Sequence, residues 1–283
     1  MSAKELTKLQ LLMAAWRQTI SCMKIPRFYT PFIVYALLQV FILIGFVLFN
    51  YFPFSKIFMP IQKAIYGEAA LHYPNNFIIL PSLFDITNIA LSGIAGILVL
   101  ALATQYFFFY TDKKNIPGGS VREVLRRFPD LFGVWVIETA VILGLIYGAT
   151  IVSPDYPNYV SFITAGRITG AVVIMAAFAY AIVIIVTEGK RFWAAIWKSF
   201  RLFVRYFYIT LLMIAVPILI LQIPLDLMLT NTPEIAKKLS PEIIPVLIGS
   251  DIVFSILLNF MVIGAITFFY KTAVVANEKA LLV

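Results

Sequence analysis

Six long stretches from which charged side chains are almost absent constrain this chain more than any other feature. Blocks of about 20 apolar residues match the hydrocarbon thickness of a bilayer. A charge at the bilayer centre costs at least about 2.5 to 3.5 kcal/mol on insertion scales, so charges mark the expected limits of each span. The spans are expected at Phe28 to Ser55, Ile86 to Thr111, about Leu131 to Ser153, Ile168 to Thr187, Tyr206 to Leu225 and Ile252 to Tyr270.

The composition supports a lipid environment for these stretches. Of the 283 residues, 61% are hydrophobic and 13% are charged, against about 45 to 50% and about 25% in soluble domains. Backbone polar groups inside lipid must be satisfied within each span, and the continuous apolar runs lack the alternation that a β-barrel requires. We therefore expect an all-α, polytopic membrane helix bundle with about six transmembrane helices.

The basic residues predict how the chain is oriented in its membrane. Seventeen of the 22 Lys and Arg residues fall on the side that would hold both termini, and five fall on the other side. Because Lys and Arg concentrate in cytoplasmic loops, both termini are expected to be cytoplasmic, in a prokaryotic cytoplasmic (inner) membrane. The basic side is expected to attract anionic lipid headgroups. The alternative is that these charges only fix the topology. Nothing in the sequence implies nucleic acid binding.

Three basic segments that precede odd-numbered spans share one design. Residues 8–25, 120–132 and 189–204 each place apolar residues at helical spacing against Lys and Arg, as Leu12, Trp16 and Ile20 do in the first segment. Such segments are expected to be short amphipathic helices in the membrane interface. The candidate contacts to lipid headgroups are Arg17, Lys24, Arg122, Arg126, Arg127, Lys190, Arg191, Lys198, Arg201 and Arg205.

These segments also suggest an internal repeat. Each is followed by two spans, so the single membrane domain 1–283 is predicted to hold three units of amphipathic elbow helix plus helical hairpin, at about 8–111, 118–187 and 189–276. The alternative is that three unrelated segments converged on a basic and aromatic composition.

The third elbow carries a motif, E-G-K-x-x-x-A-A-x-x-x-S-x-R-L, at Glu188 to Leu202. Set between two spans, it resembles the equivalent segment of six-helix prokaryotic membrane proteins related to the membrane domain of glycerophosphodiester phosphodiesterases. The resemblance is sharpest from Thr187 to Asp226. It implies the fold and a link to lipids. Because the chain shows no soluble phosphodiesterase domain, no enzymatic role follows from it.

Glu138 is the single charge well inside a span, about 10 Å past the expected edge at 1.5 Å of rise per residue. An intramembrane carboxylate indicates a proton or cation site, or a partner for a basic group. The alternative is a glutamate that only holds helices together or reaches to the interface.

The remaining features favour structure over chemistry. With one cysteine and one histidine, Cys22 and His72, disulfide frameworks and most metal sites are excluded, and no cofactor is expected. Small-residue faces for close helix packing, within the chain or against another subunit, are predicted at Gly144 to Gly148, Ser92 to Gly96 and Gly166 to Gly170. The loop Asn50 to Phe84, rich in proline and apolar residues, is expected on the outer interface or against a partner.

Three functions are compatible with this sequence. The leading hypothesis is a noncatalytic membrane subunit or scaffold of a lipid-handling or envelope complex, with lipids and other membrane subunits as partners. The second is a transporter of a small solute, ion or lipid that uses Glu138. The third is a membrane-embedded lipid enzyme, for which Tyr106, Tyr110, Asp112 and Arg122 lie near one level without forming a known motif. The chain is expected not to be an enzyme.

Overall fold

The computed structural model describes residues 8–110, 120–152 and 160–275, so Thr111, Asp112 and Ser153, and the repeat limits 118 and 276, lie outside the described residues. In this part of the chain there are helices and turns but no strand. Six helical segments are long and apolar enough to cross a membrane, which confirms the all-α polytopic prediction. They are Pro26–Val47, Leu80–Tyr110, Phe128–Ile151, Phe162–Glu188, Phe207–Thr230 and Ile243–Val275.

Several spans are longer than the charge-free stretches predict. The second and sixth have 31 and 33 residues, and include Asp85 and Asp251 respectively. At 1.5 Å per residue a helix of this length exceeds the hydrocarbon core of about 30 Å. A carboxylate near one end of such a helix can therefore lie beyond the hydrocarbon. Limits set by the nearest charges then underestimate the length of the helix.

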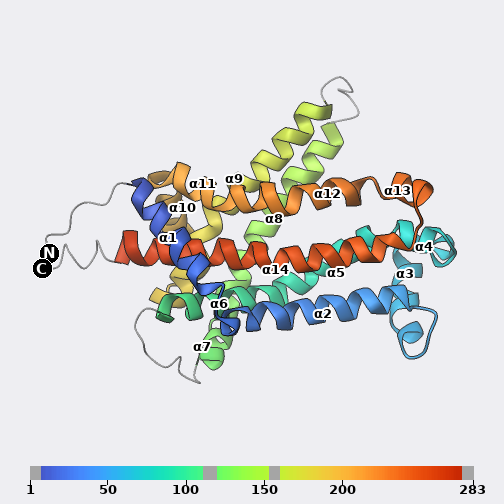
Figure 1. Cartoon of the computed structure of the whole chain (residues 1–283), viewed down its shortest axis with the longest axis horizontal. Helices are drawn as coiled ribbons and strands as arrows, with labels where there is room; N and C mark the ends of the chain where they lie inside the picture. Colours follow the sequence, from blue (N-terminus) through green and yellow to red (C-terminus); the bar gives the residue numbers. More distant parts are fainter. Residues whose placement is uncertain (1–7, 111–119, 153–159, 276–283) are drawn as a thin grey trace, which may run out of the picture. The chain divides into compact units, whose positions relative to one another are not determined.

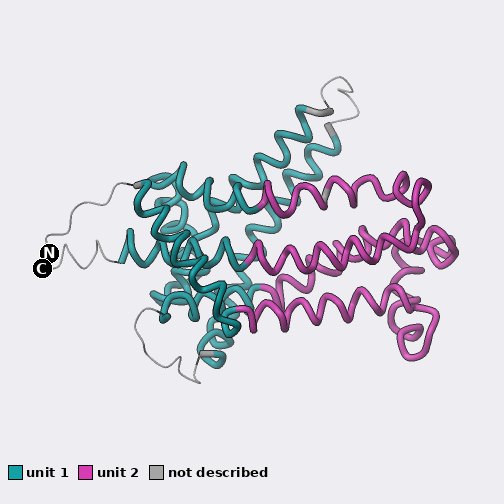
Figure 2. Tube along the Cα trace, viewed as in Figure 1, with its two compact units in different colours: residues 1–28, 97–217, 260–283 teal, residues 29–96, 218–259 magenta. Residues whose placement is uncertain are grey.

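The described residues divide into two compact units (Figure 2), each built from segments distant in sequence. Unit 1 comprises residues 1–28, 97–217 and 260–283, and unit 2 comprises 29–96 and 218–259. This division does not follow the predicted threefold repeat, which stays a prediction. The three predicted elbows are present as separate helices in unit 1: α1 (Lys8–Cys22), α7 (Ser120–Arg126) and α10 (Phe192–Arg205).

Unit 1 holds these elbows against longer helices. The longer helices are α6 (Ile97–Tyr110), α8 (Phe128–Val152), α9 (Val160–Glu188), α11 (Phe207–Pro217) and the end of α14 (Ile243–Tyr270), which continues as a π-helical turn, η8 (Lys271–Val275). Buried aromatic rings form much of its core, with Phe107 in contact with Phe28, Phe260 and Phe268. Helix α1 approaches α14 closely, because a Cβ at Gly264 would lie 2.6 Å from Cγ2 of Thr19.

Helices α8 and α9 run side by side as a hairpin within unit 1 (Figure 1). Leu145 packs against Gly170, where an added Cβ would lie 2.7 Å from a leucine methyl carbon. A Cβ at Gly144, Gly148 or Gly166, by contrast, would meet nothing within 4 Å. Only one of these four glycines is therefore used for close packing inside the described chain. The span that α8 supplies is also the least buried of the six, since only 11% of the residues in its most apolar stretch are buried.

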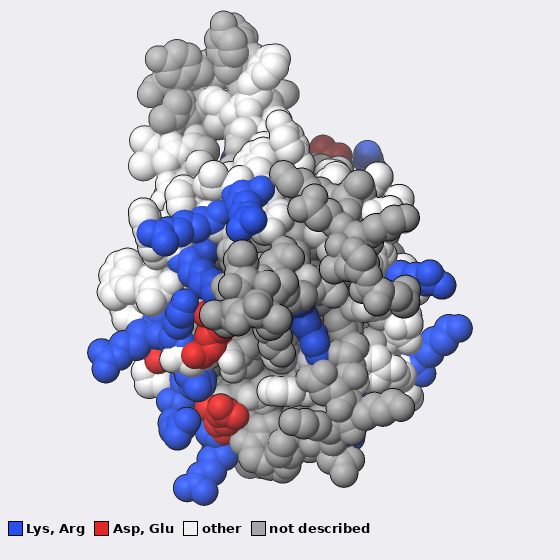
Figure 3. Space-filling view, turned by 90° about the vertical axis from the view of Figure 1, so that its left-hand side faces the viewer, with Lys and Arg blue, Asp and Glu red and all other residues white. Residues whose placement is uncertain are grey.

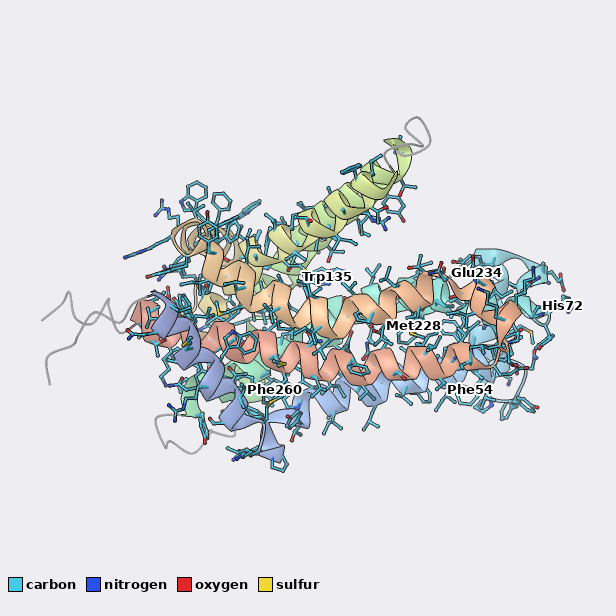
Figure 4. The ribbon with its side chains drawn as sticks, turned by 45° about the horizontal axis from the view of Figure 1, so that its top comes forward. Phe54, His72, Trp135, Met228, Glu234 and Phe260 are labelled. Carbon is cyan, nitrogen blue, oxygen red and sulfur yellow. The ribbon has the colours of Figure 1, made fainter. Side chains whose placement is uncertain are left out.

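Unit 2 packs α2 (Thr30–Val47), α5 (Leu80–Leu91) and the start of α14 around one apolar cluster that includes Phe46, Leu83 and Ile248. Its remaining elements are short: η2 (Phe54–Lys56), α3 (Phe58–Tyr66), η3 (Glu68–Leu71), α4 (Asn75–Ile78), η4 (Ser92–Gly96), η7 (Ile218–Gln222), α12 (Ile223–Thr230) and α13 (Thr232–Lys238). The turn η1 (Pro26–Tyr29) leads into α2. Figure 4 shows Phe54, His72 and Glu234 at the loop end of this unit.

Three hydrogen bonds tie the spans of unit 2 together. Tyr35 and Gln39 of α2 both donate hydrogen bonds to Oδ1 of Asn88 on α5, at 3.0 and 2.7 Å. Gln222 donates to Asp251 at 2.9 Å. Interhelical hydrogen bonds of this kind contribute roughly 0.6 kcal/mol each in membranes. These polar side chains therefore serve helix packing.

Candidate functional site

The junction between α9 and α10 depends on one glycine. Helix α9 ends at Glu188, and Gly189 follows with φ of +71°, a left-handed conformation that glycine adopts without steric cost. The Gly189 amide donates to the Ile185 carbonyl at 3.1 Å, which closes the last turn of α9. An added Cβ would also lie 2.8 Å from the guanidinium nitrogens of Arg127. Two features therefore explain why the E-G-K motif has a glycine here: its positive φ and the close approach of Arg127.

Glu188 is the centre of a set of contacts that fixes α10 in place. Its carboxylate pairs with the ammonium groups of Lys198 at 2.7 Å and Lys190 at 3.0 Å. The hydroxyl of Tyr270, a fully buried residue at the end of α14, donates to the same carboxylate. The side chains of Glu188 and Lys198 are only about a fifth exposed, at 22% and 21%. We call these four residues the Glu188 clamp.

Two further polar side chains, Asp130 and Ser199, hold α10 through three hydrogen bonds. The backbone amide of Phe192, at the start of α10, donates to Oδ1 of Asp130 at 3.1 Å, so a carboxylate from α8 caps a helix N-terminus. Ser199 is fully buried, donates to the Ala177 carbonyl at 2.6 Å and accepts from the Tyr180 amide at 3.2 Å. Helix α10 is therefore fastened to α8, α9 and α14.

The opposite face of α10 is uncovered and strongly apolar. Trp193, Trp197, Phe200 and Val204 are 66%, 59%, 46% and 60% exposed. Their spacing of four, three and four residues places them in one stripe along the helix. The guanidinium of Arg201 lies 5.3 Å from the ring centroid of Trp197. We call this stripe the α10 outer face.

The ten predicted headgroup contacts separate into two groups in the structure. Arg127, Lys190 and Lys198 take part in the internal contacts just described. Seven remain exposed, and all belong to unit 1: Arg17, Lys24, Arg122, Arg126, Arg191, Arg201 and Arg205. Figure 3 shows Lys and Arg side chains gathered on one face of this unit.

Glu138 lies on α8, one turn after Trp135, which is labelled in Figure 4. Its side chain is partly exposed, and no hydrogen bond or ion pair to it is found within the described ranges. The structure thus places Glu138 in the least covered span, and does not pair it with any residue of the Glu188 clamp.

Of the residues weighed for lipid chemistry, Asp112 lies outside the described residues, and the two tyrosines make packing contacts. Tyr106 lies under the guanidinium of Arg27 at 6.0 Å, and Tyr110 packs edge-on against Phe28 at 5.2 Å. Within the described ranges, no three His, Cys, Asp or Glu residues lie close enough together to hold a metal ion. Both tyrosines therefore have packing roles.

Sequence reasoning found the elbow and its basic residues but missed two partners. Asp130 and Tyr270 lie far along the chain from the motif, and no local pattern links them to it. Asp130 is the third residue of α8, and Tyr270 directly precedes Lys271. Both residues look like ordinary residues at the end of a span, so the sequence gives no sign that they contact the motif.

The architecture defines the class of the chain, a multi-pass helical membrane protein. The chain matches no model of a known protein family, and comparison with curated proteins and with solved structures gives no match. The resemblance seen at Glu188 to Leu202 stays a prediction.

Proposed function

We propose that this chain is a noncatalytic integral membrane subunit or scaffold, and that it binds anionic lipid headgroups through the α10 outer face and the exposed arginines beside it. Its proposed location is the prokaryotic cytoplasmic membrane, with both termini and the elbows on the cytoplasmic side. A lipid-handling or envelope complex is the proposed setting.

The single observation that carries this proposal is the two-sided character of α10. The Glu188 clamp, Asp130 and Ser199 bind one side of the helix, and tryptophan and phenylalanine are exposed on the other. Trp is enriched at membrane interfaces, and helices with aromatic and basic residues lie in the interface plane. A water-exposed helix would gain nothing from this arrangement, whereas a lipid interface buries the rings and pairs the arginines with phosphates.

The subunit part of the proposal is supported by the α8 and α9 hairpin. Its first span is 11% buried, and Gly144 and Gly148 leave open space beside α8. Small residues let a neighbouring membrane helix approach closely. Isolation from native membranes in mild detergent is expected to recover the chain with a partner protein. A lone, dispersible monomer would contradict this part.

The lipid part is tested by native mass spectrometry of the purified chain with phosphatidylglycerol and phosphatidylcholine. The triple variant Arg191→Gln, Arg201→Gln, Arg205→Gln removes three exposed charges near α10. Each basic residue near an anionic surface is worth about 1 kcal/mol before screening, so the preference for phosphatidylglycerol is expected to fall about tenfold or more. The matched control, Lys63→Gln, Lys237→Gln, Lys238→Gln, removes equal charge from unit 2. An equal loss in both variants would contradict the assignment to α10.

A second candidate is transport of a small solute, ion or lipid that depends on Glu138. One observation favours it: this intramembrane carboxylate is partly exposed and forms no hydrogen bond or ion pair within the described residues. Unpaired charges in spans are costly and usually functional. Flux in proteoliposomes should then fall in Glu138→Gln relative to an active parent. Unchanged flux would remove an essential charged site at this position.

A further inference from the structure

Helix α3 belongs to the connection between the first two spans, and its buried side carries one apolar and one polar side chain. Phe58 and Gln62 are buried, and Gln62 is fully so. Its side-chain amide donates to the Phe46 carbonyl at 3.0 Å, which satisfies an otherwise open carbonyl in the last turn of α2. The side of α3 that packs against the rest of unit 2 therefore carries Phe58 and a hydrogen-bonded glutamine.

The exposed sides of α3 differ sharply from each other. Ile57, which precedes the helix, Ile61 and Ile65 are 60%, 38% and 45% exposed, and their four-residue spacing places them in one stripe. Lys63 lies nearly opposite Ile61 on the helix and pairs with Glu68 at 2.9 Å, with both side chains mostly exposed. Seen along its axis, α3 thus has a protein side, an isoleucine side and a charged side.

The segment that leads into the isoleucine side packs against an exposed residue of a membrane span. Phe41 on α2 is 55% exposed and its ring lies 5.9 Å from that of Phe54, just before α3. Phe54 is labelled in Figure 4. Phe52, 76% exposed, is covered on one face by the ammonium of Lys56 at 5.2 Å. An exposed face of a span is solvated by lipid, so the segment before α3 lies next to lipid.

We propose that α3 is an interfacial membrane helix whose Ile57, Ile61 and Ile65 side lies among the lipid headgroups and upper acyl chains. The occupant of this face is lipid, because the segment before α3 packs on the exposed Phe41 of α2 and because aromatic and lysine side chains flank the isoleucines, as at membrane interfaces. With the orientation proposed above, this is the outer leaflet. The proposal does not depend on the α10 outer face.

Site-directed spin labelling tests this proposal on the full chain in vesicles of phosphatidylethanolamine and phosphatidylglycerol. The substitution Cys22→Ala first removes the native thiol. A nitroxide is then attached at Ile61→Cys in one chain and, as the matched control, at Lys63→Cys in another. Accessibility to oxygen, which concentrates in lipid, is compared with accessibility to a water-soluble nickel chelate. The oxygen-to-nickel ratio is expected to be severalfold higher at position 61 than at position 63.

Each alternative result overturns the proposal in a recognisable way. Equal, nickel-dominated ratios at both positions would mean that α3 faces water. Shielding of position 61 from both reagents would mean that protein, such as a second copy of the chain, covers this face. Because α3 is held by Phe58 and Gln62 rather than by Ile61, the labelled chains should elute like the parent. The same comparison at Ile57→Cys and Ile65→Cys gives two further readings should one labelled chain be unstable.

Discussion

The ion pair between Glu188 and Lys198 is expected to stabilise the fold measurably, unlike most ion pairs at protein surfaces. The perturbation is a double-mutant cycle of Glu188→Gln, Lys198→Met and the two together. Glutamine keeps an acceptor for the Tyr270 hydroxyl, and methionine keeps much of the length of lysine. The cycle therefore isolates the coupling between the two charges.

The size of this coupling follows from the exposure of the two side chains. Exposed pairs contribute about 0 to 1 kcal/mol, and breaking a fully buried pair costs about 3 to 5 kcal/mol. At 22% and 21% exposure and a distance of 2.7 Å, an intermediate coupling of about 1 to 2 kcal/mol is expected on these scales. Lys190 keeps part of the carboxylate interaction, which holds the value below the buried limit.

The chain offers a matched control for this cycle. Lys238 and Glu234 also form an ion pair, at 3.7 Å, but their side chains are 77% and 72% exposed. Their coupling is expected to be about 0 to 0.5 kcal/mol. Unfolding in mixed detergent micelles can be followed by tryptophan fluorescence, since Trp193 and Trp197 lie on α10 itself. A Glu188 to Lys198 coupling no larger than that of the control pair would refute the clamp.

Two more predictions concern the elbows of unit 1. Gly189→Ala is expected to lower the free energy of unfolding by about 1 to 2 kcal/mol, because Gly189 has a positive φ. Gly144→Ala, in open space on α8, should leave it unchanged or raise it by up to about 1 kcal/mol. Thermal unfolding of both variants checks this contrast. Burial raises the pKa of the Cys22 thiol from 9.0 to about 11, so its thiolate fraction at pH 8 falls by about 100-fold. Native maleimide labelling at pH 8 should be far slower than in unfolded chain and should accelerate as the pH rises towards 11; equal rates in both states would contradict the buried thiol.

The positions of the six spans could be predicted from the sequence because lipid imposes a direct requirement on each segment separately. A run of apolar residues is sufficient to predict a span, whatever its neighbours are. The limits of the spans were less predictable, since helices that project beyond the hydrocarbon can carry carboxylates such as Asp85 and Asp251. The elbows were predictable for a related reason, because local basic and aromatic spacing indicates an interfacial helix.

The buried sides of the elbows could not be read from apolarity alone. For α1, the pattern predicts a lipid-facing side with Leu12, Trp16 and Ile20; Ile20 is 51% exposed in the structure, but Leu12 is buried together with Ala15, Thr19 and Cys22. The protein-facing side is made of small side chains, which let α1 approach α14 closely at Gly264. Such a choice depends on a partner helix that is distant in sequence.

The contacts of the Glu188 clamp were unpredictable for the same reason. The motif contains Glu188, Gly189 and Ser199, yet Tyr270 joins the clamp from α14, and Asp130, outside the clamp, holds the start of α10 from α8. These contacts also change the interpretation of the basic residues. Lys190 and Lys198 carry charges that the sequence assigns to lipid, and in the structure both are paired with Glu188.

The most direct test of the account is whether the α10 outer face lies in the membrane. In a chain with Trp16→Phe and Trp135→Phe, only Trp193 and Trp197 remain to fluoresce. In vesicles containing phosphatidylglycerol, lipids brominated near the top of the acyl chain are expected to quench these two tryptophans strongly, and aqueous acrylamide only weakly. Free quenching by acrylamide with none by brominated lipid would place the face in water and contradict the account.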